Sequence, residues 1–271
     1  MSSEPILTNR LRKELHSLDD VKGRRRSGLF VAEGTKCVLE LAVTFKARYV
    51  FARPEWLLEH GDAFDAGSVI ECGASVLREI TRLGTTPPVI ACFELPPAAE
   101  CPDRSFFESN LVLALDRVQD PGNLGTILRT CDWMGVRTIL ATHDTVDAFN
   151  PKTVQATMGA LARVRVVYCD LVEVLSSLEG SVPVYGTFLD GDNIYGAALS
   201  HNGVVVMGNE GSGISVAVES HISRRLYIPP YPADAQTVES LNVGSATAIV
   251  LSEFRGAYFR TQSGTPVRRK V

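Results

Sequence analysis

Residues 208–213, Gly-Asn-Glu-Gly-Ser-Gly, form the stretch whose composition best suits ligand binding. Three glycines in six residues predict a turn in which the backbone adopts positive φ or comes close to a ligand. A P-loop would need Gly-Lys-Ser/Thr, and no lysine follows these glycines. A dinucleotide fingerprint reads G-x-G-x-x-G, whereas this loop reads G-x-x-G-x-G. We therefore expect a ligand held by backbone amides and carbonyls rather than a polyphosphate.

Four further polar residues stand where they could act on a substrate: Asn123, Arg129, Ser240 and Asn242. Each also has a structural explanation. A lone helix arginine commonly forms a surface ion pair, an asparagine after glycine suits a turn, and Ser240 and Asn242 could cap the helix that begins there. Glu210 lies inside the glycine loop, although glutamate is unfavourable in a turn. We therefore expect a specific partner for its carboxylate.

Short apolar runs alternate with helical patterns along the second part of the chain, as in a parallel α/β sheet. The predicted strands cover residues 111–115, 138–141, 164–168, 182–188 and 204–207. Helices are predicted over residues 125–134, 150–161 and 243–254 and after Asp170, which begins a capping-box pattern. We expect a mostly parallel sheet of five or six strands with helices on both faces. Ligands of such sheets bind at the carboxyl ends of the strands, where the glycine loop and the loop 120–125 both fall.

The front of the chain predicts a small α/β domain of its own. Residues 22–28 are predicted to form a basic loop that contains Arg24, Arg25 and Arg26. Residues 10–30 carry seven basic and three acidic side chains, which fits an RNA-facing patch or an ordinary solvated surface. The proline-rich residues 96–105 predict a linker. They divide the chain into a front domain, residues 1–95, and a second domain, residues 106–271.

Composition sets outer bounds on the class of protein. The 271 residues are 45% hydrophobic and 21% charged, which is ordinary for a soluble globular protein, and the net charge of −4 argues against a nonspecific nucleic-acid coat. No apolar run reaches the roughly 20 residues of a membrane helix, and a signal-peptide core is lacking, so a cytoplasmic location is expected. The six cysteines are widely spaced and predict buried free thiols rather than a metal site.

Three ordered motifs resemble the SpoU (TrmH-like) family of SPOUT RNA methyltransferases. They are residues 111–135 with Arg129, the glycine loop, and Ile228-Pro229 followed by Ser240-Leu241-Asn242-Val243. The resemblance implies transfer of a methyl group from S-adenosylmethionine to a ribose 2′-hydroxyl of structured RNA. It implies catalytic or substrate roles for Arg129, Asn123, Glu210, Ser240 and Asn242. It implies cofactor contacts from Thr187, Gly208, Asn209, Gly211, Ile228 and Leu241. Residues 231–238 widen the last motif, and Gly244 replaces its usual serine.

The resemblance also implies features that no pattern in the sequence shows. They are a C-terminal trefoil knot, a homodimer packed through the knot region, and a ribosomal-protein-like (L30e-like) front domain that grips RNA through Arg24, Arg25 and Arg26. Ribosomal RNA is favoured over transfer RNA as the substrate. Two alternatives stay open: a noncatalytic RNA-binding relative of the family, and a nucleotide-dependent oxidoreductase. The missing G-x-G-x-x-G after the first strand disfavours the oxidoreductase.

Overall fold

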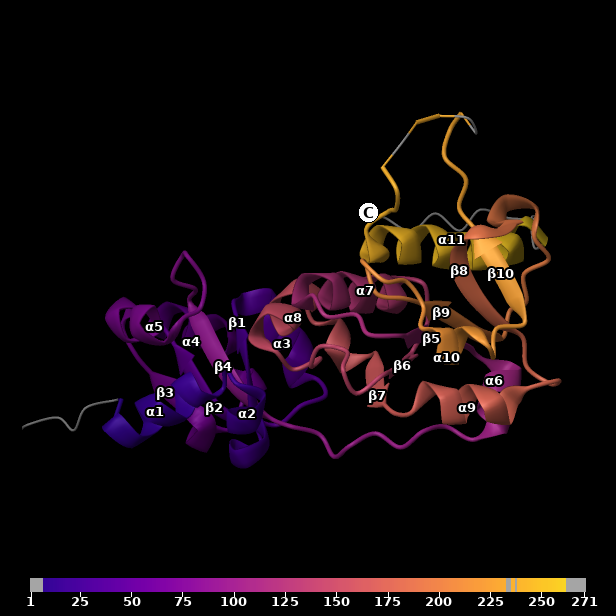
Figure 1. The fold of residues 1–271 in the computed structure, drawn as a ribbon. Helices are drawn as coiled ribbons and strands as arrows, with labels where there is room; N and C mark the ends of the chain where they lie inside the picture. Colours follow the sequence, from indigo (N-terminus) through magenta and orange to yellow (C-terminus); the bar gives the residue numbers. More distant parts are fainter. Residues whose placement is uncertain (1–6, 233–234, 237, 262–271) are drawn as a thin grey trace, which may run out of the picture. The chain divides into compact units, whose positions relative to one another are not determined.

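The computed structural model describes residues 7–232, 235–236 and 238–261, so part of the predicted widening at 231–238 lies outside the described residues. The contacts group into two compact units (Figure 1). Unit 1 holds the chain up to Ala99 together with Asp120–Arg129 and Val146–Arg165. Unit 2 holds Glu100–Gln119, Thr130–Thr145 and the chain from Val166 onward. Unit 1 therefore takes in two segments that follow the predicted linker, and the domain limits 1–95 and 106–271 stay a prediction.

The front of unit 1 is a four-stranded sheet in the order β1-β4-β2-β3. Its strands are β1 (Leu29–Glu33), β2 (Ala47–Ala52), β3 (Val69–Glu71) and β4 (Val89–Glu94). β4 pairs antiparallel with β1 and β2, and β2 pairs parallel with β3. The accompanying helices are α1 (Asn9–Ser17), α2 (Val21–Ser27), α3 (Thr35–Ala42), α4 (Pro54–His60) and α5 (Ala74–Ile80), with 3₁₀ turns at Gly61–Ala63 and Ala66–Ser68. Leu15, Leu18, Val31, Phe51 and Leu77 form part of one buried core cluster.

The predicted basic loop at residues 22–28 is wrong, because residues 22–27 lie in helix α2 and Gly28 is its C-terminal cap. Asp20 precedes the helix in an extended conformation. Gly28 ends it at φ 70, where its N–H donates to the carbonyl of Arg24. The sequence Val-Lys-Gly-Arg-Arg-Arg-Ser shows no apolar periodicity from which a helix could be predicted. Tertiary contacts of the Arg24 side chain stabilise this helix instead, so packing overrides the local propensity.

A six-stranded sheet among the described residues follows the order β10-β8-β9-β5-β6-β7. Its strands are β5 (Leu111–Leu115), β6 (Thr138–Ala141), β7 (Arg165–Tyr168), β8 (Val184–Asn193), β9 (Gly203–Met207) and β10 (Arg224–Tyr227). β5 pairs parallel with β6 and β9, and β8 pairs parallel with β9 and β10. The prediction of a mostly parallel sheet is thus confirmed. β5 and β9 are buried along their whole length, as expected of parallel strands covered on both faces.

The remaining helices are α6 (Arg104–Ser109), α7 (Pro121–Trp133), α8 (Pro151–Thr157), α9 (Leu171–Leu178), α10 (Val216–Glu219) and α11 (Val243–Thr261), with 3₁₀ turns at Ala160–Ala162 and Ile194–Gly196. Within unit 2, α11 lies on one side of the sheet and α6 and α9 lie on the other (Figure 1). Asp170 caps α9 as predicted, accepting from the N–H groups of Val172 and Glu173. The helix predicted over 150–161 ends early, because Met158 and Gly159 adopt positive φ values of 52 and 94.

Candidate active site

The carboxyl ends of three neighbouring strands meet at one edge of the sheet in unit 2. Leu115, the last residue of β5, pairs with Met207 of β9 on one side and with Ala141 of β6 on the other. The N–H of Asp116 extends the ladder by donating to the carbonyl of Met207 at 2.9 Å. The residues that follow these strands are Asp116 and Arg117, Thr142, and the glycine loop that begins at Gly208. The sheet thus gathers them at the edge where open α/β folds bind ligands.

Asn209 organises the glycine loop. Its backbone exchanges two hydrogen bonds with Gly213, at 3.0 and 2.9 Å. Its side-chain oxygen accepts from the N–H groups of Gly211 and Ser212 at 2.9 and 3.1 Å. Its side-chain nitrogen donates to the carbonyl of Arg117 at 2.8 Å. The Asn209 side chain therefore shapes the loop and ties it to the end of β5.

Gly208 is a position where only glycine fits. A Cβ atom there would lie 2.3 Å from the carbonyl carbon of Gly213 and 2.4 Å from the nitrogen of Ile214. Both contacts are with backbone, which cannot rotate away as a side chain can. The two ends of the loop approach each other closely because residue 208 has no side chain.

Asp116 is a buried anchor that the sequence-based list of site residues did not include. It is 1% exposed, and one carboxylate oxygen accepts from the N–H of Ser215 at 2.6 Å. The other oxygen accepts from Nε of Arg117 at 3.2 Å. Charge-assisted bonds of this kind are stronger than neutral ones. A carboxylate directly after an entirely apolar parallel strand was the sequence signal that could have identified it.

Arg117 is the second residue that the sequence-based list omitted. Its backbone has φ 61, in the left-handed region that non-glycine residues rarely adopt. The conformation is held by its N–H, which donates to Oγ1 of Thr142 at 2.9 Å, and by its carbonyl, which accepts from Asn209. The guanidinium reaches across and donates to the carbonyl of Gly213 at 3.3 Å. Strained residues held in this way cluster at functional sites.

Asn123 and Arg129 both lie on α7, in the part of the helix that belongs to unit 1. Asp120 begins the helix, because its carboxylate accepts from the N–H of Asn123 at 2.8 Å. Asn123 is half-buried and Arg129 is exposed. A rise of 1.5 Å per residue separates their backbones by about 9 Å along the helix axis. The helix therefore offers the two groups at different heights rather than at one point.

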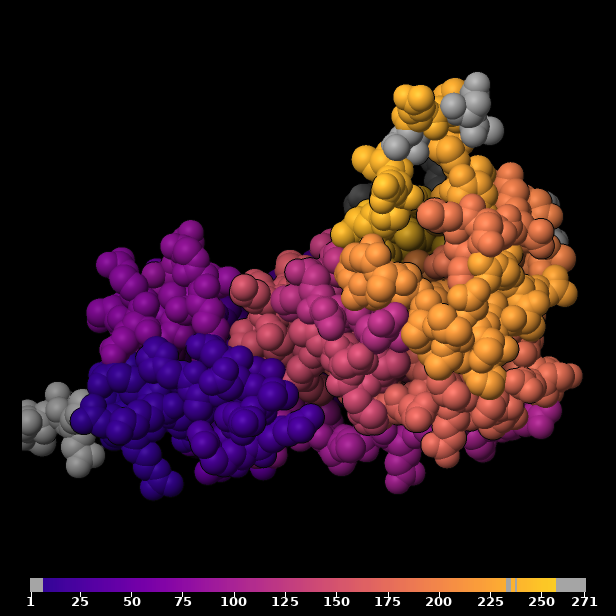
Figure 2. All heavy atoms as spheres, viewed as in Figure 1, coloured from indigo at the N-terminus to yellow at the C-terminus, as the bar shows by residue number. Residues whose placement is uncertain are grey.

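The third predicted motif lies at the start of α11. Asn242 accepts on its side-chain oxygen from the N–H groups of Gly244 and Ser245, at 2.9 and 3.2 Å, so it caps the helix. Ser240 is exposed, and Leu241 is 48% exposed. The described residues between Ile228 and Val243 stand out from the surface of unit 2 (Figure 2).

The other predicted members of the site differ in exposure. Glu210 is exposed in the glycine loop, and Ile228 is half-buried directly after β10. Thr187 is half-buried on β8, and its hydroxyl lies 3.7 Å from the sulfur of Met207 at the end of β9. Thr187 therefore lies beside the strand that leads into the glycine loop.

The prediction that Arg24 binds RNA is wrong, because its side chain is buried. Its side chain is 2% exposed and donates to Asp147 Oδ2 from Nε and Nη2, at 3.0 and 2.6 Å. It also donates to the carbonyls of Leu18 and Asp19 at 2.7 and 3.0 Å. These four bonds use the guanidinium inside the protein, so Arg24 is withdrawn as an RNA ligand. Arg25 and Arg26 are exposed.

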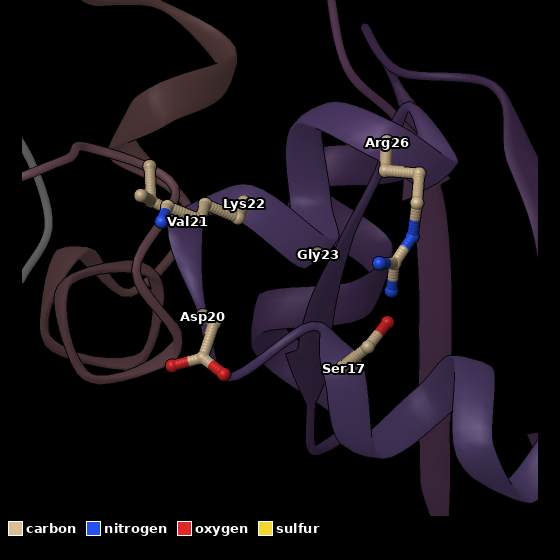
Figure 3. Close-up of a pocket in the computed structure, with 6 residues that line it drawn as sticks. All are labelled: Ser17, Asp20, Val21, Lys22, Gly23 and Arg26. Carbon is tan, nitrogen blue, oxygen red and sulfur yellow. The ribbon is translucent and has the colours of Figure 1, made fainter.

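A hollow of about 450 Å³ lies where α1 meets α2. It is lined by Ser17, Asp20, Val21, Lys22, Gly23 and Arg26. Figure 3 shows the Arg26 side chain extending toward the hydroxyl of Ser17, with Asp20 on the other side of the hollow. Lys22 and Arg26 give this surface positive charge, and the carboxylate of Asp20 neutralises part of that charge.

Four of the six thiols are buried, Cys169 is half-buried and Cys101 is exposed, so the prediction of buried thiols is wrong for Cys101. Burial raises the pKa of Cys37 and of Cys92 to about 12 and also raises the pKa of Cys131, so these thiols stay protonated near neutral pH. Within residues 7–232, 235–236 and 238–261, no group of three potential ligands could hold a metal ion. No helix in the same residues is long and apolar enough to cross a membrane.

Comparison with known proteins identifies the family to which most of the chain is similar. Residues 110–252 match the SpoU rRNA Methylase family, and residues 9–91 match the MRM3-like substrate binding domain. The chain is 37% identical over 163 residues to the 23S rRNA 2′-O-methyltransferase RlmP of Bacillus subtilis. That match spans 59% of this chain and 64% of the relative, so less than two thirds of the relative's length is covered.

Two solved structures extend the similarity to nearly the whole chain. A TrmH-family protein from Porphyromonas gingivalis superposes with a TM-score of 0.83 at 39% identity, covering 93% of this chain and 99% of that one. An AdoMet-bound rRNA methyltransferase from Sinorhizobium meliloti superposes with a TM-score of 0.79 at 31% identity, covering 93% and 96%. The family match covers more than half of the chain and includes all three motifs. This protein belongs to the SpoU rRNA methylase family.

Proposed function

We propose that this protein transfers a methyl group from S-adenosylmethionine to a ribose 2′-hydroxyl of structured RNA, with ribosomal rather than transfer RNA as the substrate. The observation that carries the proposal is the hydrogen-bonded glycine loop at the carboxyl ends of β5, β6 and β9, in a chain that belongs to this family. The relatives named above, an rRNA 2′-O-methyltransferase and an AdoMet-bound rRNA methyltransferase, favour the same substrate class.

The donors at the loop fit a cofactor without phosphates. The loop offers backbone groups and contains no lysine, and the Asn209 side chain holds the loop in shape. Backbone atoms of Gly208, Ile228 and Leu241 would hold the cofactor, with Thr187, Asn209 and Gly211 beside them. S-adenosylmethionine supplies an electrophilic methyl group on a sulfonium. The chain's task is to hold the ribose oxygen in line with that group.

Arg129 is proposed to bind an RNA phosphate and to stabilise negative charge near the attacking oxygen. A guanidinium is not deprotonated in proteins, so charge stabilisation and positioning suit it better than proton abstraction. In the reaction a carbon–oxygen bond forms, the carbon–sulfur bond breaks, and the hydroxyl proton passes to solvent. Asn123 and Glu210 are proposed to orient the reacting groups. Ser240 and Asn242 are proposed to contact substrate, which for Asn242 comes in addition to its capping bonds.

The front domain is proposed to be L30e-like and to grip RNA through Arg25 and Arg26, which α2 exposes. Lys22 lies on the same helix and lines the hollow shown in Figure 3. Phosphate contacts of this kind position an RNA without reading its sequence. As further parts of the proposal, the last segment of the chain forms a trefoil knot, the protein works as a homodimer through that region, and it acts in the cytoplasm.

Labelled methyl transfer tests the function directly. The protein and its Arg129→Ala variant are incubated with labelled S-adenosylmethionine and with unmodified ribosomal or transfer RNA. We expect label at a single alkali-resistant dinucleotide of ribosomal RNA and loss of label in the variant. Cofactor binding without transfer to either RNA would instead support a noncatalytic RNA-binding relative. Absence of cofactor binding would overturn the proposal.

A further inference from the structure

Residues 146–165 belong by sequence to the family-matched region, yet they pack against the front domain inside unit 1. One contact is the ion pair between Arg24 of α2 and Asp147, which is 2.6 Å long and has an arginine side chain that is 2% exposed. Asp147 uses its other oxygen to accept from the N–H of Phe149 at 3.0 Å. A buried guanidinium that loses such a partner is strongly unfavourable, so the pair fixes Asp147 against α2.

Apolar and hydrogen-bonding contacts hold the rest of the segment. The ring of Phe149 lies 4.8 Å from that of Phe30 on β1 and 6.2 Å from that of Phe45, measured between centroids. Further along, Cys37 Sγ donates to the carbonyl of Val154 at 3.7 Å. The Thr44 hydroxyl donates to the carbonyl of Ala162 at 3.0 Å. The segment is therefore attached to the front domain before, within and after α8.

Helix α8 is in turn packed tightly against the start of α7. A Cβ atom at Gly125 would lie 2.4 Å from the Cβ of Ala156 and 2.9 Å from the carbonyl oxygen of Thr153. Neither atom can rotate away. The two helices can therefore approach this closely only because residue 125 has no side chain. Gly125 stands between Asn123 and Arg129 in the sequence. The part of α7 that carries both site residues is thus packed against α8 at Gly125.

We propose that the front domain, acting through residues 146–165, fixes the position of the start of α7 and with it Asn123 and Arg129. The front domain then supports these two residues within unit 1, in addition to offering a surface for RNA. Arg24, Asp147 and Phe149 are positioning residues: they act through α8 and touch no substrate. The inference rests on the proposed function for its kinetic consequence, but not for its structural one.

Hydrogen–deuterium exchange tests the structural consequence without any assay of activity. The variants are Phe149→Ala and the pair Arg24→Met with Asp147→Asn, which removes both charges together and leaves no unpaired one. We expect exchange in residues 121–129 to accelerate by about tenfold, since local opening follows the loss of packing contacts. Exchange in residues 203–207 should stay unchanged. Exchange in β2 and β4 reports whether the front domain is still folded.

Steady-state methyl transfer tests the kinetic consequence. In the same variants we expect kcat to fall about tenfold, while the affinity for S-adenosylmethionine and the KM for RNA change by less than about twofold. Arg163→Gln is the matched control, because its pair with Glu40 crosses the same interface but is 41% and 37% exposed. It should change neither exchange nor kcat.

The two measurements separate the possible failures. Unaltered exchange in residues 121–129, in variants whose α8 has loosened, would overturn the coupling. A raised KM with unchanged kcat would also overturn it, because the front domain would then serve RNA binding alone. If the wild-type protein transfers no methyl group, the proposed function fails, and the exchange experiment still decides whether the front domain holds α7.

Discussion

The glycine loop and the segment that leads into α11 carry the two halves of the proposed cofactor site, and they are held in different ways. The loop is bonded to the end of β5 by two side chains, Asn209 to the carbonyl of Arg117 and Asp116 to the N–H of Ser215. These contacts join residues more than ninety positions apart. The segment from Ser240 to Asn242 is exposed, and two bonds to the Asn242 side chain come from the helix that directly follows it.

The glycine loop is therefore held by contacts that are distant in sequence, whereas the segment from Ser240 to Asn242 has a local helix cap. The loop's conformation follows from the sheet, so it is expected to be in place before a ligand arrives. A preorganised group avoids the ordering cost of binding. The segment from Ser240 to Asn242 is exposed to solvent, so its contribution to binding is expected to depend more on the ligand itself. Substitutions in the two halves should therefore affect stability and binding in different proportions.

Gly208→Ala should have the largest effect, because the added methyl group meets the backbone of Gly213 and Ile214 at 2.3–2.4 Å. The loop must open to relieve this contact, at a cost of about 2 kcal/mol or more. We expect the affinity for S-adenosylmethionine to fall by about 30-fold or more, measured by titration calorimetry.

Gly211→Ala is the matched comparison for that variant. Its Cβ would meet only the side-chain oxygen of Asn209, at an ordinary 3.6 Å. We expect a change in affinity of about threefold or less. Equal losses in the two variants would show that the close approach at Gly208 is not what shapes the site.

Asp116→Asn should have the next largest effect. The substitution keeps the size of the side chain but removes the charge that the N–H of Ser215 and Nε of Arg117 share. Bonds to a charged acceptor contribute about 1.5–3 kcal/mol. We expect a lower Tm and about tenfold weaker cofactor binding.

The same substitution at Asp190 serves as its control. Asp190 is exposed and pairs with Arg225, whose guanidinium holds the pKa of that carboxyl below its ordinary value. No change in cofactor affinity is expected there. Loss of binding in Asp190→Asn as well would mean that net charge, rather than the buried contact, governs affinity.

These contrasts also explain how far the sequence alone could lead. β5, β6 and β9 were predictable, because continuous apolar runs of three to five residues mark strands buried on both faces. The glycine loop was predictable from its composition. The link from Asp116 to Ser215 was not, because 99 residues separate them and no local pattern reports which loop a carboxylate will meet.

The burial of Arg24 likewise could not be predicted from the sequence. Its neighbours Arg25 and Arg26 have the same side chain and are exposed, whereas Arg24 is buried against Asp147, 123 residues away. Composition cannot distinguish three consecutive arginines. Helix α2 does so, because successive side chains point about 100° apart and only one of the three faces the protein.

Asn242→Ala should mainly affect stability, because it removes the cap of α11. Loss of such a cap costs about 1 kcal/mol, and we expect a correspondingly lower Tm in thermal unfolding. Asn242→Ser keeps an N-cap acceptor and should recover most of that loss. If the serine variant recovers stability but not methyl transfer, Asn242 has a role in the reaction beyond its cap. If both recover together, the cap accounts for the whole effect.

Ser240→Ala should have the smallest effect on the fold. The residue is exposed, so the free energy of unfolding is expected to change by about 0.5 kcal/mol or less. If its hydroxyl contacts the substrate in the reaction, kcat should still fall, by about three- to tenfold, which corresponds to the loss of one modest hydrogen bond. Single-turnover methyl transfer at saturating cofactor measures that step alone. An unchanged rate would remove Ser240 from the proposed catalytic set. A reduced rate at unchanged Tm would show that the exposed half of the site acts on the reaction without supporting the fold, whereas at Asp116 the Tm and cofactor binding are expected to fall together.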